Sequence, residues 1–110
     1  MPNYSQYEII LVRYPFSNLS SSKVRPAVIV NSSYPSNDLL IVPITSRLVG
    51  LLPGEFVLAE WQTSGLNVPS AIKRGIYTIE QRLVQHTIGQ LAPSDIAKLT
   101  TALRLWLGLS

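Results

Sequence analysis

The chain has 110 residues, a length that suits one compact domain over residues 1–110 and leaves no room for a second hydrophobic core. Its formal net charge is +3 and its isoelectric point is near 9.5, which favours an anionic partner without requiring one. Cysteine is absent, which excludes disulfides and thiolate chemistry, and no stretch reaches the roughly 20 apolar residues that a membrane-spanning helix needs.

The first part of the chain reads as strands separated by turn-forming residues. Residues 7–16 (YEIILVRYPF) are rich in β-branched and aromatic side chains and predict a strand. Polar turn formers follow at 17–23, and residues 24–30 (VRPAVIV) predict a second strand with Pro26 near its start, where a missing donor is tolerated. Residues 38–44 (DLLIVPI) are almost wholly apolar and predict a third strand, buried on both faces.

Three shorter elements are predicted in the middle of the chain. Residues 55–59 (EFVLA) alternate between polar and apolar side chains and predict a fourth strand. Residues 60–67 predict a single helical turn, ended by Gly65. Residues 70–79 predict a fifth strand that is kinked or bulged around Gly75.

The last segment changes to helical spacing. A helix is predicted from Pro93, which suits a first turn, to Leu107, with Gly108 as its stop. Asp95 in the first turn complements the helix dipole. The side chains expected to be buried by this helix, against the sheet or a dimer mate, are Leu99, Leu103, Trp106 and Leu107. Short strands followed by one helix predict an α+β, mostly β fold, with a small antiparallel barrel or sheet and a helix packed on it.

Composition also bears on the surface. Charged residues make up 14% of the chain, against roughly 25% in typical domains, so part of the surface has to be apolar or neutral. We therefore expect a homodimer face or a partner groove, although a monomer covered by serine, threonine, asparagine and glutamine also fits. The N-terminal residues lack the charged start and apolar core of a secretory signal, and a cytoplasmic location is expected.

Four segments occur in a specific order: YEIILVRYPFSNLSSSKVRPAVIV, LLIVPITSR, GLNVPSAIKRGIYTIEQRL and IGQL. The most specific pieces are the RP dipeptide that opens the second strand and the PITS motif that ends the third. Together with the closing helix, these segments resemble the MazF/PemK family of toxin endoribonucleases from about Tyr7 to Leu109. The resemblance implies an SH3-like barrel that forms a homodimer and cuts single-stranded RNA without a metal or other cofactor. It also implies an antitoxin partner, whose disordered tail lies along the dimer.

The resemblance implies catalytic roles for Arg25 and Thr45. RNA can be cleaved by attack of its own 2′-OH on the adjacent phosphate, which needs positive charge near the phosphate oxygens. Arg25 matches the family's catalytic arginine, and a permanently charged guanidinium suits charge stabilisation; the alternative is an exposed strand arginine with a solvated head. Thr45 matches the catalytic threonine and would position the phosphate. Alternatively, Thr45 and Ser46 only end the strand through side-chain bonds to the backbone.

Further polar residues are candidates for RNA contacts. His86 is the only histidine, but it lies outside the family's catalytic positions, and one histidine without cysteine argues against a zinc site. Tyr77 and Gln81 could contact bases, but packing explains them more readily. The residues expected to line an RNA groove are Lys23, Ser46, Arg47, Lys73 and Arg74.

The chain departs from the family pattern at two places. The loop before the RP dipeptide is SNLSSSK, where many members have a Gly-rich loop with an acidic residue. Lys73, Arg74 and Gly75 stand where many members have an acidic residue, and Glu80 is nearby in sequence. The alternative to a metal-independent endoribonuclease is therefore a non-catalytic binding module, or a toxin that resembles gyrase inhibitors, on the same fold.

Overall fold

The computed structural model describes residues 4–13, 23–31 and 38–109. It contains strands β1 (Glu8–Arg13), β2 (Val24–Ile29), β3 (Asp38–Thr45), β4 (Phe56–Val57), β5 (Ala71–Ile72), β6 (Tyr77–Glu80) and β7 (Val84–Gln90), followed by helix α1 (Pro93–Leu107). The predicted loop at 17–22 and the end of the first predicted strand, residues 14–16, lie outside the described residues.

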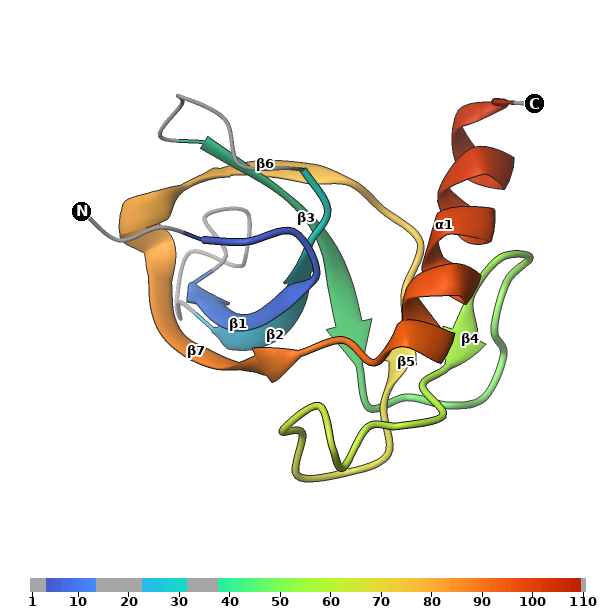
Figure 1. Cartoon of the computed structure of the whole chain (residues 1–110), viewed down its shortest axis with the longest axis horizontal. Helices are drawn as coiled ribbons and strands as arrows, with labels where there is room; N and C mark the ends of the chain where they lie inside the picture. The colour runs from blue at the N-terminus through green and yellow to red at the C-terminus, as the bar shows by residue number, and fades with distance from the viewer. Residues whose placement is uncertain (1–3, 14–22, 32–37, 110) are drawn as a thin grey trace.

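The strands form one sheet of seven in the order β4-β5-β3-β2-β1-β7, with β6 paired to β3 off this path. All the pairings are antiparallel. The sheet curls into a barrel-like ring, but it stays open, since a short 3-10 turn (Gln81–Leu83) rather than a hydrogen-bonded ladder leads from β6 to β7 (Figure 1). The predicted α+β, mostly β class is confirmed, with an open sheet in place of a closed barrel.

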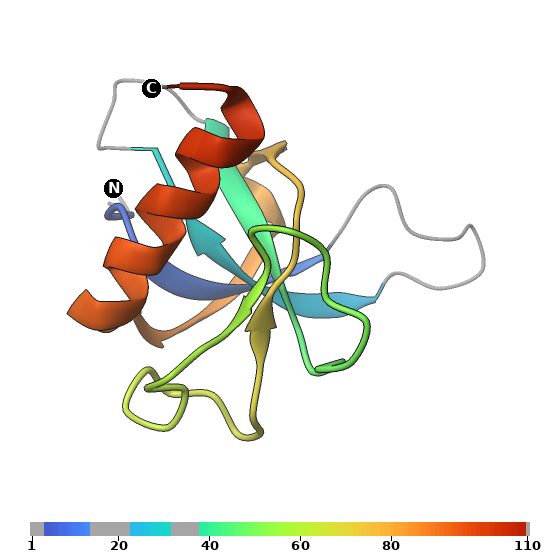
Figure 2. The same cartoon turned by 90° about the vertical axis from the view of Figure 1, so that its right-hand side faces the viewer.

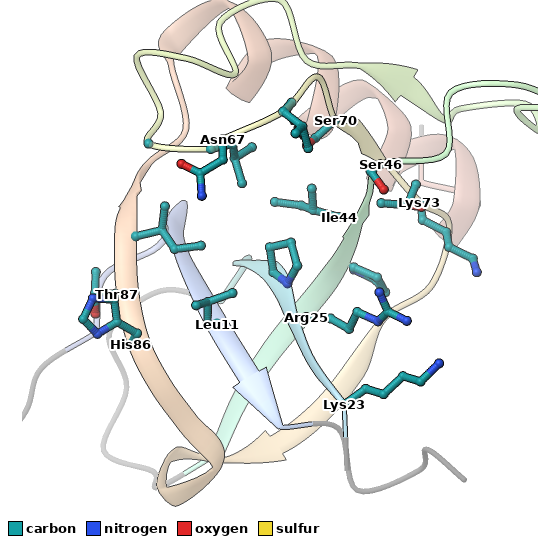
Figure 3. A pocket seen from close by; sticks show the side chains of 17 residues that line it. Leu11, Lys23, Arg25, Ile44, Ser46, Asn67, Ser70, Lys73, His86 and Thr87 are labelled. Carbon is teal, nitrogen blue, oxygen red and sulfur yellow. Dashed lines mark hydrogen bonds between the residues drawn. The ribbon is translucent and has the colours of Figure 1, made fainter. Parts of the chain in front are cut away.

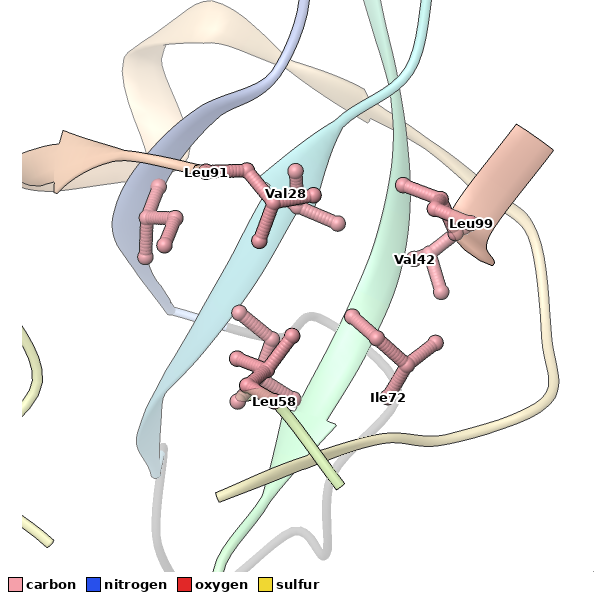
Figure 4. Packing of buried hydrophobic residues seen from close by; sticks show 8 residues of the cluster. Val28, Val42, Leu58, Ile72, Leu91 and Leu99 are labelled. Atoms are coloured by element: carbon pink, nitrogen blue, oxygen red, sulfur yellow. The ribbon is translucent and has the colours of Figure 1, made fainter. Parts of the chain in front are cut away.

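The central strands bury both of their faces, because side chains alternate along a strand. On one face the sheet packs beneath α1 through a cluster that includes Ile9, Val28, Val42 and Leu99 (Figure 4). The opposite face fills the inside of the ring with Ile10, Val12, Ala27, Ile29, Leu39, Ile41 and Ile79. The expectation that the third strand is buried on both faces holds from Ile41 to Ile44, whereas Leu40 is 38% exposed.

Helix α1 has the predicted bounds. Gly108 ends it in the left-handed conformation, with φ of 69°, and its N–H bonds to carbonyls of the last turn. Leu99 is fully buried and Leu103 and Trp106 are partly buried, but Leu107 is 55% exposed, so its predicted burial is wrong for the single chain. The reason is geometric: at 3.6 residues per turn, Leu107 lies about 80° round the helix from Leu99.

Two expectations about the strands need correction, and one strand was not predicted. The fourth strand is only Phe56–Val57, and the fifth is divided into β5 and β6 by residues 73–76, where Gly75 has φ of 146°. Residues 60–65 form the expected turn, ended by Gly65 at φ of 97°. β7 was not predicted, since its sequence VQHTIGQ is largely polar and lacks clear alternation.

Candidate functional site

A cavity of about 850 Å³ opens where the N-terminal part of β2 and the C-terminal end of β3 meet. Leu11 of β1 lies on its floor, β7 forms one side, and the segment 65–68 forms the wall next to β7 (Figure 3). Figure 2 shows the yellow-green loop that carries this segment and leads into β5. The cavity gathers residues from both halves of the chain, because β1 pairs with β2 on one edge and with β7 on the other.

Most of the predicted site residues line this cavity. They are Lys23, Arg25, Thr45, Ser46 and Lys73. Arg47 and Arg74 are not among the lining residues, and their contact with RNA stays a prediction. Tyr77 and Gln81 lie on β6 and in the turn after it, also outside the lining.

The register of the strands brings Arg25 and Thr45 to the same place. β2 and β3 pair as far as Ala27 opposite Pro43. If this register is extended by two residues in each strand, Arg25 of β2 comes to lie opposite Thr45 of β3. Residues opposite each other have their side chains on the same face of the sheet. The pairing of β2 with β3 ends at Ala27 and Pro43, and beyond it Thr45 is paired on the other edge of β3, with Ala71 of β5. Arg25 and Thr45, which the family resemblance pairs in catalysis, both line the cavity beyond the end of this pairing.

Among the described residues, the Thr45 hydroxyl has one hydrogen-bond partner. Its Oγ1 accepts a hydrogen bond of 3.1 Å from the N–H of Arg47. The bond matches the alternative in which Thr45 ends the strand through its side chain, and it is also compatible with positioning. A hydroxyl that accepts a backbone N–H still has its own proton to donate. The geometry therefore suits donation to a phosphate oxygen.

The cavity is electropositive. Lys23, Arg25 and Lys73 line it, and within the described ranges neither aspartate nor glutamate does. Glu80, the nearby acidic residue in sequence, lies on β6 and forms an exposed ion pair with Arg82 at 2.9 Å. The hydrogen bond and charge of Arg82 lower the pKa of Glu80 below its usual range. Glu80 thus does not replace the acidic residue that the family pattern has near Lys73.

Glu55 fixes the backbone of the segment that contains Lys73 and Arg74, at the edge of the cavity. Its Oε1 accepts the Leu52 N–H at 2.6 Å and its Oε2 accepts the Arg74 N–H at 2.8 Å. Burial raises the pKa of Glu55, but these two backbone hydrogen bonds and the charges of Lys73 and Arg74 outweigh it and leave the pKa below its ordinary value. Sequence reasoning missed this residue, because its partner Arg74 is 19 positions away.

The turn that leads into the cavity wall of residues 65–68 is held by contacts within the protein. Asp95, fully buried in the first turn of α1, accepts the N–H groups of Ala59 and Glu60, both at 3.0 Å. At the other end of the turn, Gly89 of β7 lies so close to the Ser64 carbonyl that a Cβ there would collide with it. The turn that carries the lining segment 65–68 is therefore tied to both α1 and β7.

No metal-binding cluster and no membrane-spanning helix occurs in the part of the chain that the structure describes. Among residues 4–13, 23–31 and 38–109, no group of three histidine, cysteine, aspartate or glutamate side chains is placed to hold a metal ion. Within the same ranges, no helix has the length and apolar character needed to cross a bilayer. His86, which the family pattern does not use, does line the cavity.

Comparison with known proteins places this geometry in context. Residues 5–107 match a family described as PemK-like, MazF-like toxins of type II toxin-antitoxin systems. An endoribonuclease from Mycobacterial species, solved with its cognate antitoxin, superposes with a TM-score of 0.80 at 17% identity over 97% of both chains. The Mycobacterium tuberculosis toxin MazF-mt6 gives 0.76 at 23% identity, over 94% of this chain and 98% of that one. A chain of the MazE-MazF structure from Deinococcus radiodurans gives 0.76 at 17% identity over 100% of both chains.

Identities this low establish a shared fold and nothing finer. A search of curated proteins found no match.

Proposed function

The chain belongs to the PemK-like, MazF-like family of toxins of type II toxin-antitoxin systems, and from this premise we propose that it is an endoribonuclease that cuts single-stranded RNA without a metal. The observation that carries the proposal is the cavity itself, which gathers Arg25, Thr45 and two lysines around one electropositive space. Fold neighbours described as endoribonucleases support the same reaction.

The chemistry follows from the reactive groups. The 2′-OH of the substrate loses its proton and attacks the adjacent phosphorus, the bond to the 5′-oxygen breaks, and that oxygen takes up a proton. The products are a 2′,3′-cyclic phosphate and a 5′-hydroxyl. Arg25 stabilises the negative charge that develops on the phosphate oxygens, because its guanidinium can form parallel hydrogen bonds to two of them. The Thr45 hydroxyl donates a hydrogen bond to one phosphate oxygen and so fixes the phosphate relative to Arg25. Lys23 and Lys73 bind the flanking phosphates.

The proposal includes partners. Fold neighbours solved with an antitoxin support an antitoxin partner for this chain. A homodimer is supported by exposed apolar side chains in two segments, among them Leu52 at 56%, Leu105 at 60% and Leu109 at 60%. These segments are linked by a hydrogen bond of 3.0 Å from Trp106 Nε1 to the Pro53 carbonyl. We also propose that the single-stranded RNA is messenger RNA, and the proposed location is therefore the cytoplasm.

A second candidate function rests on one observation. Since no carboxylate from the described part of the chain lines the cavity, the usual acidic group for proton transfer is missing there. The alternative is a non-catalytic binding module, or a toxin that resembles gyrase inhibitors. One experiment separates the two functions.

The experiment measures cleavage of a long single-stranded RNA by the purified protein in EDTA, with the new ends mapped. Discrete cuts that carry 2′,3′-cyclic phosphates are expected. Arg25→Ala should slow them by about 10²–10³, the size typical of removing one preorganised charge-stabilising contact. The matched control is Arg104→Ala, because Arg104 is exposed on α1 and does not line the cavity; its rate should equal that of the wild type.

Each other outcome contradicts a specific part of the proposal. Wild-type rates from Arg25→Ala would remove Arg25 from catalysis. Loss of cutting in EDTA would indicate a metal-dependent reaction. A folded protein that cuts no RNA would favour the binding module.

A further inference from the structure

Strand β7 is irregular on both sides of His86. His86 pairs with Leu11 of β1, and the register shifts by one residue on either side, so that Gln85 and Ile88 fall outside the paired positions. Successive side chains of a regular strand point to opposite faces, whereas a bulge redirects them. As a result His86, Thr87 and Ile88 all line the cavity, although they are consecutive.

An apolar row joins His86 to the cationic side of the cavity. Leu11 pairs with Pro26 of β2 on one edge and with His86 on the other, and all three residues line the cavity. Directly paired residues lie on one face of a sheet. Because neighbouring strands are about 4.8 Å apart, the row spans roughly 10 Å. This distance is comparable to the reach of one nucleotide from its phosphate to the edge of its base.

The two sides of the cavity differ in chemistry. Lys23, Arg25 and Lys73 lie on one side of Leu11, and Asn67, His86 and Thr87 lie on the other (Figure 3). In the part of the chain that the structure describes, the second side has no lysine or arginine. Its amide, imidazole and hydroxyl groups offer neutral donors and acceptors, and the imidazole adds a flat ring. The first side suits phosphates, and the second suits a nucleobase.

We infer that the β7 side of the cavity is a nucleobase subsite. The base of a nucleotide next to the cleaved bond lies beyond the apolar row of Pro26 and Leu11, stacks on the imidazole of His86 and hydrogen-bonds to the amide of Asn67. The inference rests on the proposed function, since it takes the cationic side as the place of the RNA backbone. Phosphate contacts carry no sequence information, so His86 and Asn67 determine which sequence is cut.

The test uses His86→Ala and Asn67→Ala, with Gln85→Ala as the matched control. All three side chains are exposed, and Gln85 does not line the cavity. Binding of fluorescent octamers of adenylate, uridylate and cytidylate is measured by anisotropy at several salt concentrations. His86→Ala and Asn67→Ala should each weaken binding of the octamer that the wild type prefers by about 10-fold, bringing the three Kd values together. The salt dependence should not change.

A phosphate contact would behave differently. Lys73→Gln should weaken the binding of all three octamers and reduce the slope of log Kd against log salt by about 0.7. The same behaviour from His86→Ala and Asn67→Ala would overturn the subsite. So would Kd values equal to those of Gln85→Ala, or a wild type that does not discriminate between the octamers.

Mapping the cuts separates this inference from the proposed function. If the wild type cuts at a preferred sequence, the preference should relax at one position beside the cut in both variants. An unchanged preference would overturn the subsite and leave the endoribonuclease in place. If the wild type cuts nothing, but its octamer preference depends on His86 and Asn67, the proposed function fails and the nucleobase subsite stands.

Discussion

Replacing Asp95 tests whether the wall of the cavity is held from the helix. The carboxylate is fully buried and accepts the Ala59 and Glu60 N–H groups, each at 3.0 Å. A hydrogen bond to a charged group contributes about 1.5–3 kcal/mol, so the pair has an upper limit of about 3–6 kcal/mol. Ala59 and Glu60 are exposed residues, and water can reach their N–H groups once the carboxylate is removed. We therefore expect Asp95→Ala to lower the free energy of unfolding by about 2–4 kcal/mol.

Asn at this position refines the measurement, because its side chain keeps one acceptor oxygen and replaces the other by a donor. Asp95→Asn should cost about half as much as Asp95→Ala. The assay is urea unfolding, with the midpoint and slope fitted for each variant. The control is Ser94→Ala, since Ser94 is exposed at the preceding position; its cost should stay within about 0.5 kcal/mol.

The same variants connect stability with activity. Under conditions where Asp95→Asn is folded, the loosened turn should raise KM for RNA more than it lowers kcat, because Asn67 and its neighbours are placed by this turn and Arg25 is not. If Asp95→Ala lowered the free energy of unfolding by less than about 1 kcal/mol, the two hydrogen bonds to Asp95 would not be the contacts that hold the wall in place.

Two further substitutions test the ties described above. Gly89→Ala places a Cβ against the Ser64 carbonyl, and we expect a loss of at least about 2 kcal/mol in urea unfolding, since backbone on both sides cannot yield easily; an unchanged midpoint would show that β7 and the turn are not in close contact in solution. Glu55→Gln should destabilise at neutral pH. The folded-state pKa of Glu55 is lowered, so its stabilisation is present above the ordinary carboxyl range and is lost as the pH falls through the folded-state value. The difference in unfolding free energy between wild type and Glu55→Gln should therefore shrink in acid, and a constant difference would contradict the assignment.

Local sequence signals predicted the elements that local chemistry determines. Pro93 and Gly108 mark the two ends of α1 in a stretch with helical apolar spacing, and the observed bounds agree. The first three strands are runs of β-branched and apolar residues, and each appears within two residues of its predicted start. The roles of Arg25 and Thr45 came from the family resemblance and stay predictions, although both residues line the cavity.

The features that were missed depend on partners far away in the chain. β7 is a strand because β1 supplies the ladder on its edge, not because VQHTIGQ favours one. The two N–H donors of the wall, Ala59 and Glu60, are separated from their acceptor Asp95 by 36 and 35 positions, and no local pattern indicates such a pair. The sequence also did not predict that His86 lines the cavity. Its position there depends on bulges in β7, which only the pairing with β1 reveals.

The position of β1 between β2 and β7 also governs when the cavity can exist. β2 is synthesised soon after β1 and can pair with it early, whereas the other edge of β1 waits for residues 84–90, and Tyr7 waits for the N–H of Leu91. The face of the sheet that packs beneath α1 remains uncovered until the helix follows. A nascent chain on the ribosome therefore contains Arg25 and Thr45 long before the cavity around them can form. The cavity is completed only after the residues of α1 have been synthesised.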